Sequence, residues 1–276
     1  MNPHAPAPVS LTSLVHSLWG NRGLIFQMTR RDVIGRYKGS AMGLLWSFVN
    51  PILLLVLYTL VFSVVFKARW GGSEPESRTQ FAILLFVGMI VHSLFSEALV
   101  RAPTLILSNV SYVKKIVFPL EILPVISMGA SVFHAMVSVL VLAGALVLMN
   151  GYLPWTAVFL PLILMPLIVL SLGLAWALAS LGVFLRDVAQ PIGLAMTVLL
   201  FASPVFYPVS ALPEYVQPWL MLNPLTFIIE QSRSVLVFGE PPHVRGLILY
   251  FLVSIAIAWL GYAWFQKTRK GFANVL

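Results

Sequence analysis

Apolar runs long enough to cross a bilayer alternate with short polar loops along most of this chain, and this alternation limits the possible folds more than any other feature. A hydrocarbon core of about 30 Å requires about 20 apolar residues in a helix. With 59% hydrophobic and only 9% charged residues, the composition is also that of a lipid-embedded protein. We therefore predict an all-α integral membrane protein with six spans, at residues 41–66, 80–100, 121–149, 156–184, 188–207 and 244–266.

Basic residues concentrate in every second loop. Most of the 17 Lys and Arg residues lie around 22–38, 101–115, 186 and 267–270, whereas the basic residues of the other loops are balanced by glutamates. The positive-inside rule therefore predicts that both termini are cytoplasmic, as an even number of spans requires. The net charge of +8 is then mainly a topology signal, and no nucleic-acid partner is predicted.

Several kinds of chemistry have no residues to support them. The chain has no cysteine, which excludes thiol nucleophiles, disulfides and thiolate metal sites. It has no GxxxxGK[ST] phosphate-binding loop, so the energy for any transport must come from a gradient or from a partner. The first ten residues are rich in proline and predict a disordered tail without a cleavable signal peptide.

The segment before the first span predicts surface helices. Apolar residues of 11–18 recur at helical spacing, whereas 24–40 mixes aliphatic, aromatic and basic residues without a clean stripe. Such a mixture suits anionic lipid headgroups, but a solvated lead-in that carries topology charges fits the periodicity equally well. We divide the chain into a cytoplasmic tail and interface helix at 1–40 and a transmembrane domain at 41–276.

A second amphipathic segment lies in the loop after the second span. Within residues 108–124, apolar side chains fall on one helical side, lysines lie between them, and Pro119 ends the turn. A short helix held between two spans could dock a cytosolic partner, although the spacing alone favours an interfacial helix that contacts only lipid.

Prolines divide the segment between the last two spans. Six of them fall between residues 208 and 242, and the apolar pieces between them are too short to cross a membrane. Irregular backbone at membrane depth survives only where protein or a water-filled cavity covers it. We predict two short external half-helices that dip back toward the bilayer, with a Glu230–Arg233 pair at i, i+3. Spacing predicts a second pair, Glu97–Arg101, at the cytoplasmic boundary.

Three further patterns concern the spans. Small residues at 171, 175 and 179 predict that this face packs on protein. His92 and His134 could form a proton relay, but buried histidines more often bond to a nearby backbone group or serine.

Aromatic rings could stack on sugars along a channel or could form an interfacial belt, which is the more common role. The candidates are Trp46, Tyr58, Phe206, Tyr207, Tyr215 and Trp219.

Two functional classes are disfavoured by the residues that the spans lack. Ion-coupled secondary transporters usually carry an ionisable group at mid-membrane, and the predicted spans have no Asp, Glu, Lys or Arg there. A membrane-bound enzyme such as a glycosyltransferase needs paired carboxylates or a His/Asp cluster, and none is recognisable. We predict no catalytic residue and no metal site.

The segment RRDVIGRYKGSAMGLLWSFVNPILLLVLYTLVFSVVF (30–66) resembles the start of the permease subunits of type-2 ATP-binding-cassette polysaccharide exporters, which export O-antigen, teichoic acid and capsule chains. NVSYVKKIVFPLEILP (109–124), GVFLRDVAQ (182–190), SPVFYP (203–208) and LNPLTFIIEQSRSVLVFG (222–239) are similar to later segments of that family, in the same order. The resemblance covers almost the whole chain after about residue 20.

The resemblance implies an ATP-driven exporter in the bacterial inner membrane, built from a permease homodimer and two nucleotide-binding subunits. Those subunits would bind ATP and Mg²⁺, and this chain would need no cofactor. The substrate would be a glycan on undecaprenyl diphosphate, threaded along the dimer interface, and 205–238 would supply external gate helices. A drug or small-lipid exporter with the same plan remains an alternative.

The resemblance also assigns roles to two groups of residues. Residues 24–38 would form the interface helix, and the coupling helix seated in the ATPase would contain Asn109, Tyr112, Val113, Lys114, Lys115 and Ile116. The basic residues of the interface helix suit a lipid diphosphate, because arginine binds phosphate bidentately, but a topology role explains the same charges. These residues are Arg30, Arg31, Arg36 and Lys38.

Overall fold

The computed structural model describes residues 9–61, 78–114 and 118–276, and all regular structure in these residues is helical. Five helices among them are long and apolar enough to cross a membrane: Gly43–Val61, Gln80–Thr104, Ile122–Asn150, Trp155–Phe184 and Val244–Val275. They contain α3 (Trp46–Tyr58), α4 (Arg78–Arg101), α6 (Ile122–Asn150), α7 (Leu160–Phe184) and α11 (Val244–Thr268). Short 3₁₀ turns extend or join them: η1 (Gly43–Leu45), η3 (Ala102–Thr104), η4 (Leu107–Asn109), η5 (Trp155–Phe159) and η6 (Arg186–Val188). The predicted all-α membrane fold is confirmed.

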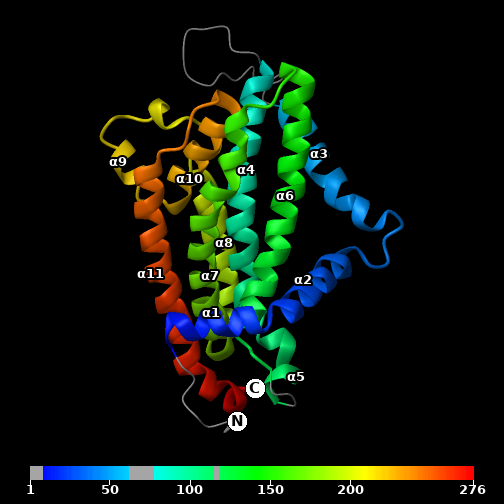
Figure 1. Ribbon diagram of the computed structural model, residues 1–276, viewed down its shortest axis with the longest axis vertical. Helices are drawn as coiled ribbons and strands as arrows, with labels where there is room; N and C mark the ends of the chain where they lie inside the picture. The colour runs from blue at the N-terminus through cyan, green and yellow to red at the C-terminus, as the bar shows by residue number, and fades with distance from the viewer. Residues whose placement is uncertain (1–8, 62–77, 115–117) are drawn as a thin grey trace.

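The predicted span 188–207 is shorter than expected. Helix α8 (Ala189–Ala202) has 14 residues, which corresponds to about 21 Å at 1.5 Å per residue. The helix ends because Ser203, at φ −101° and ψ 155°, precedes Pro204, and a residue before proline is disfavoured in the helical region. Of the predicted span, only Ala189–Ala202 is therefore α-helical, and α8 lies within the bundle (Figure 1). Residues 62–66 of the first predicted span lie outside the described part of the chain.

Helix α4 forms the centre of the main hydrophobic core, and α7 packs tightly on α11. Ser171, Ala175 and Ala179 of α7 are at most 1% exposed, which confirms the predicted packing face. Helices α7 and α11 contact each other at glycine residues. A Cβ atom added to Gly173 would lie 2.6 Å from the Cα of Ala258, and one added to Gly261 would overlap the carbonyl oxygen of Gly173.

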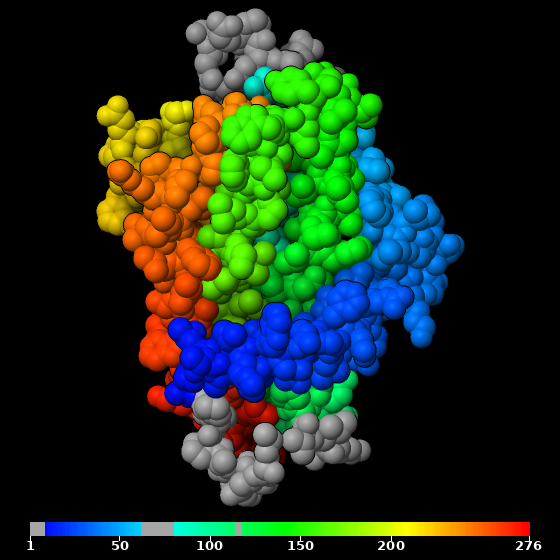
Figure 2. Space-filling view, in the orientation of Figure 1, coloured from blue at the N-terminus to red at the C-terminus, as the bar shows by residue number. Residues whose placement is uncertain are grey.

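One end of the bundle carries the surface helices. Figures 1 and 2 show α1 (Leu11–Gly20) and α2 (Arg22–Tyr37) as a blue band across this end, where α5 (Val110–Lys114), η9 (Arg269–Gly271) and α12 (Phe272–Val275) also lie. Leu14 is buried against the bundle, whereas Val15 and Trp19 of α1 are exposed. This arrangement is typical of an amphipathic helix at a membrane interface.

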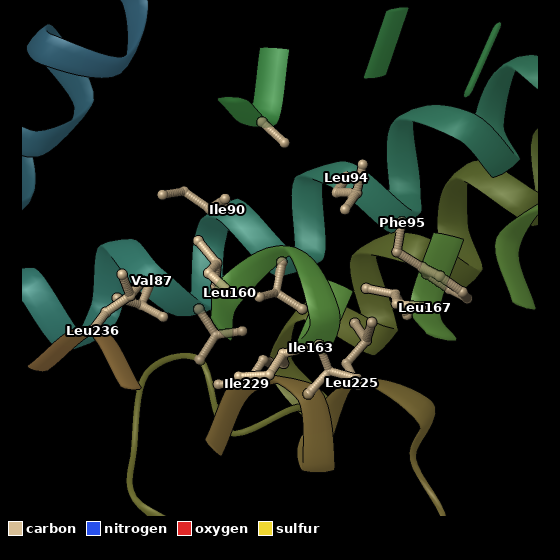
Figure 3. Close-up of a cluster of buried hydrophobic side chains, with 14 of the residues drawn as sticks. Val87, Ile90, Leu94, Phe95, Leu160, Ile163, Leu167, Leu225, Ile229 and Leu236 are labelled. Atoms are coloured by element: carbon tan, nitrogen blue, oxygen red, sulfur yellow. The ribbon is translucent and has the colours of Figure 1, made fainter. Parts of the chain in front are cut away.

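The proline-rich segment lies at the opposite end (Figure 1). It forms η7 (Val209–Ala211), α9 (Gln217–Leu220), α10 (Pro224–Arg233) and the π-helical turn η8 (Ser234–Phe238). Figure 3 shows Leu225, Ile229 and Leu236 from this segment among core side chains of α4 and α7. Short helices that pack back into the bundle therefore replace a regular span here, as predicted.

Candidate functional site

A network of charged side chains joins the surface helix α2 to the transmembrane bundle. Arg101 of α4 donates two hydrogen bonds to the carboxylate of Asp32 in α2, at 2.8 and 2.9 Å. Burial alone would raise the pKa of Asp32, but the hydrogen bond and charge of Arg101, with the charge of Arg36, lower it overall. Such bidentate, charge-assisted pairs are among the stronger polar contacts in proteins. They fix the position of α2 relative to α4.

A second part of the network lies one helical turn farther along α2. Arg36 forms an ion pair with Glu97 of α4 and lies 3.9 Å from Asp32. The His134 ring of α6 lies between Glu97, 3.2 Å from its Nδ1, and the Tyr37 hydroxyl, 3.3 Å from its Nε2. With the proton on Nδ1, the ring donates to Glu97 and accepts from Tyr37. Three elements, α2, α4 and α6, therefore meet at one cluster.

The predicted Glu97–Arg101 pair does not form in this network. Glu97 pairs with Arg36, and Arg101 pairs with Asp32, so neither residue uses the other as its partner. The i, i+4 spacing permits contact within α4, but α2 lies across both side chains and supplies each with an opposite charge.

We expect the Asp32–Arg101 contact to stabilise the docking of α2. Asp32→Asn and Arg101→Gln should each lower the stability of the solubilised protein by about 1–2 kcal/mol, because each weakens a charge-assisted hydrogen-bonded pair. The double variant should lose much less than the sum of the two changes. Thermal unfolding of the four proteins measures this coupling. Arg30→Gln is the matched control, since Arg30 is exposed on α2 and makes no ion pair within the described residues. Additive losses would contradict the assignment.

The predicted coupling segment is attached to the bundle at both ends. The Tyr112 ring stacks on Phe118 with centroids 4.5 Å apart, and its hydroxyl accepts a hydrogen bond from Arg31 at 3.1 Å. Arg269 of η9 donates to the Phe118 carbonyl at 3.0 Å and to the Glu121 carboxylate at 2.8 Å. The end of the chain and α2 therefore both position this segment.

Glu121 is the centre of that attachment. It is only 7% exposed. Its carboxylate also accepts a hydrogen bond from Ser17 of α1 at 2.8 Å, and its carbonyl accepts one from Trp176 of α7 at 2.9 Å. A buried carboxylate needs such partners, because an unpaired charge in a low-dielectric interior is costly.

The structure gives fewer contacts for the other residues predicted to form the coupling helix. Asn109 donates a hydrogen bond to the Leu105 carbonyl at 2.8 Å. Val113 is half-buried against a separate hydrophobic cluster that includes Leu14, Ile122 and Trp176. Lys114 ends α5, and its side chain lies outside the described part of the structure, as do Lys115 and Ile116.

The four basic candidates of α2 and its end have different environments. Arg36 forms an ion pair with a carboxylate, and Arg31 donates a hydrogen bond to the Tyr112 hydroxyl. Arg30 and Lys38 are exposed, and neither makes an ion pair with another described residue. Arg30 and Lys38 are therefore the better candidates for contact with a phosphate.

The six aromatic candidates do not form one site. Tyr215 and Trp219, near and in α9, are 78% and 73% exposed. Phe206 stacks on Phe201, and the Tyr207 hydroxyl donates to the Phe201 carbonyl at 3.1 Å. Trp46 begins α3, and Tyr58 ends it with its ring against the core. The structure thus separates these residues along the length of the bundle.

In the proline-rich segment, the predicted Glu230–Arg233 pair is confirmed at 2.8 Å. Arg233 is 1% exposed and also donates to the carbonyls of Leu84 and Val205, each at 3.1 Å. His92 lies 3.0 Å from the Met196 carbonyl, so this histidine has the backbone partner expected for a buried ring. The described contacts do not join it to His134.

Local sequence patterns did not indicate several residues of these networks, notably Asp32, Tyr37, Glu121 and Arg269. A usable signal was the scarcity of acids: the chain has only nine Asp and Glu residues, and Glu121 lies within an apolar run. Among the described residues, no group of three or more His, Asp or Glu side chains could hold a metal ion.

Comparison with known proteins identifies the family. The model of the ABC-2 type transporter family matches residues 23–237. An O-antigen export system permease protein of Myxococcus xanthus is 28% identical over 264 residues, covering 95% of this chain and 98% of the relative. One from Klebsiella pneumoniae is 25% identical, covering 93% and 97%. A polysialic acid transport protein of Escherichia coli is 23% identical, covering 87% and 91%. Because the family model spans most of its length, this chain belongs to the ABC-2 type transporter family.

Proposed function

We propose that this chain is the membrane-spanning subunit of an ATP-driven exporter that moves lipid-linked polysaccharide out of the cytoplasm. The observation that carries the proposal is the nearly end-to-end similarity to permeases named for O-antigen export and to a polysialic acid transport protein. The substrate would be an O-antigen-type glycan on undecaprenyl diphosphate. The chain itself would be a permease and not an enzyme.

ATP would be hydrolysed by two copies of a separate nucleotide-binding subunit, which would also hold Mg²⁺. The absence of a phosphate-binding loop from the full sequence supports this division. The segment around Tyr112 would contact that subunit, because it lies at the end of the bundle with α1 and α2 and is attached to α2 through Arg31. Movement of the segment would then be transmitted to α2 and to the charge network of α4 and α6.

The functional unit would be a homodimer in the bacterial inner membrane, with both termini cytoplasmic. Helices α3 and α8 expose apolar side chains over most of their length, including Leu53, Leu57 and Val198. A second copy could cover part of this surface and leave a path for the glycan between the protomers. Residues 1–40 would form the cytoplasmic tail and interface helix of each protomer, and 41–276 the transmembrane domain.

The first test is deletion of the gene in its host, followed by fractionation of lipid-linked glycan. We expect glycan to accumulate on the cytoplasmic side and to disappear from the surface, and a plasmid copy of the gene should reverse both effects. Normal surface glycan without internal accumulation, in a host shown to have no second exporter, would contradict the proposal. That result would favour the export of a drug or small lipid instead.

A further inference from the structure

A polar cavity of about 280 Å³ opens between α3, α4 and α6 beside the end of α2. Ligand pockets in proteins span roughly 300–1,000 Å³, so this cavity is at the small end of the range and suits one compact ring. Its walls belong to three membrane-spanning helices, and the charge network described above forms one side. Phe86, Met89, Ile90 and Leu94 of α4 add apolar side chains to the lining.

Two polar side chains of this cavity have no hydrogen-bond partner among the residues that the structure describes. They are Asn50 of α3 and Ser93 of α4, and both are exposed although they lie within apolar spans. Pro51, which also lines the cavity, has no N–H to donate to the carbonyl of Ser47 one helical turn earlier. Polar groups facing hydrocarbon cost free energy, so these groups require a polar occupant.

The charges around the cavity select the kind of occupant. Arg36 is paired with Glu97, and Asp32 with Arg101, so the positive and negative charges of the network balance. An anion such as a diphosphate would have to displace a carboxylate from its arginine. A neutral ligand with many hydroxyl groups needs no such exchange, because each hydroxyl both donates and accepts.

The lining offers matching groups in a small space. The Asn50 amide has donors and an acceptor, and the Ser93 hydroxyl can do both. Ser138 donates to the His134 carbonyl at 3.0 Å, which leaves its oxygen able to accept. A sugar ring also has apolar C–H faces, which can lie against the Phe86 side of the cavity. Mixed polar and apolar walls of this kind suit a sugar better than a lipid tail or a free ion.

We propose that this cavity is a subsite for a single neutral sugar ring of the transported glycan. The inference rests on the proposed function and adds to it a specific place within one protomer where the chain holds its substrate. Asn50 and Ser93 would bind the ring hydroxyls, and the network of Arg36, Glu97 and His134 would keep that wall polar but neutral.

The experiment uses the complete permease–ATPase complex in cells that make the glycan with a radioactive sugar label. A photo-crosslinking amino acid replaces Ser93, and in a control protein it replaces Leu140, an exposed residue of α6 that does not line the cavity. We expect a labelled glycan adduct at position 93, attached through a sugar ring when mapped by mass spectrometry, and little or none at position 140. An adduct at 93 through the phosphate or the lipid would overturn the sugar assignment.

A substitution tests the same site without a probe. Asn50→Leu combined with Ser93→Ala should reduce the export rate at limiting glycan about tenfold, the size expected from losing two neutral hydrogen bonds. Thr197→Ala is the control, because Thr197 of α8 is exposed, bonds only within its own helix and does not line the cavity. Unchanged export by the double variant, with no adduct at position 93, would refute the subsite while leaving glycan export intact. Failure of the proposed function would instead appear as normal surface glycan in the deletion strain.

Discussion

Replacing Arg233 with leucine is expected to reduce the stability of the solubilised protein by about 3 kcal/mol or more. Arg233 is almost fully buried and donates to Glu230, to the Leu84 carbonyl and to the Val205 carbonyl. Leucine provides none of these donors and leaves Glu230 without its partner, and such losses at buried charged groups are among the larger single-residue effects. Thermal unfolding and the fraction of aggregated protein in size-exclusion chromatography measure the result.

Two further variants distinguish the contribution of the hydrogen bonds of Arg233 to stability from the contribution of its charge. Arg233→Lys keeps the charge but cannot reach three acceptors in the same planar arrangement, so it should recover only part of the loss. Glu230→Gln should have a much smaller effect, because the Glu230 side chain is 36% exposed. If Arg233→Leu were as stable as Glu230→Gln, Arg233 would not hold the proline-rich segment to α4.

The substitution Gly261→Ala is expected to destabilise the α7–α11 pair by about 1–3 kcal/mol, even though it adds a single methyl group. The added carbon would overlap the Gly173 carbonyl, which belongs to rigid helical backbone and cannot rotate away as a side chain can. The two helices would have to separate, and overpacking of this kind costs about 1–3 kcal/mol. The midpoint of thermal unfolding should therefore fall.

The matched control is Gly144→Ala in α6. A Cβ atom at Gly144 would meet nothing within 4 Å, and alanine has the higher helix propensity. We expect this variant to be as stable as the original protein or slightly more so. Equal losses in Gly144→Ala and Gly261→Ala would show that glycine is needed for some reason other than the close approach of α7 and α11.

The sequence predicted the helical class, most spans and the irregular proline-rich segment, because hydropathy and proline act locally. Twenty apolar residues in a row cross a membrane whatever surrounds them, and proline interrupts a helix wherever it stands. The Glu230–Arg233 pair was also predictable, since both partners lie on one short helix. The length of α8 could have been foreseen from Pro204, which ends the helix at Ala202.

The pairing at the junction of α2 with the bundle could not be read from local spacing. Glu97 and Arg101 stand four residues apart, yet each pairs with a residue of α2 more than 60 positions earlier in the chain. Arg269 and Glu121 are likewise far apart in sequence and bonded in space. Which of several possible partners a charge selects depends on how the helices cross, and that information is absent from any one segment.

The amino-acid sequence by itself determined that this protein lies in a membrane, that its structure is helical and that a proline-rich segment cannot cross the bilayer. The tertiary structure alone decided which charges are paired, where α7 and α11 approach through glycine, and that Asn50 and Ser93 face one cavity. The physical reason is the distance along the chain over which each kind of interaction acts. Hydropathy and backbone restrictions act within a turn or a span, whereas ion pairs and cavities form only where separate helices have already packed together.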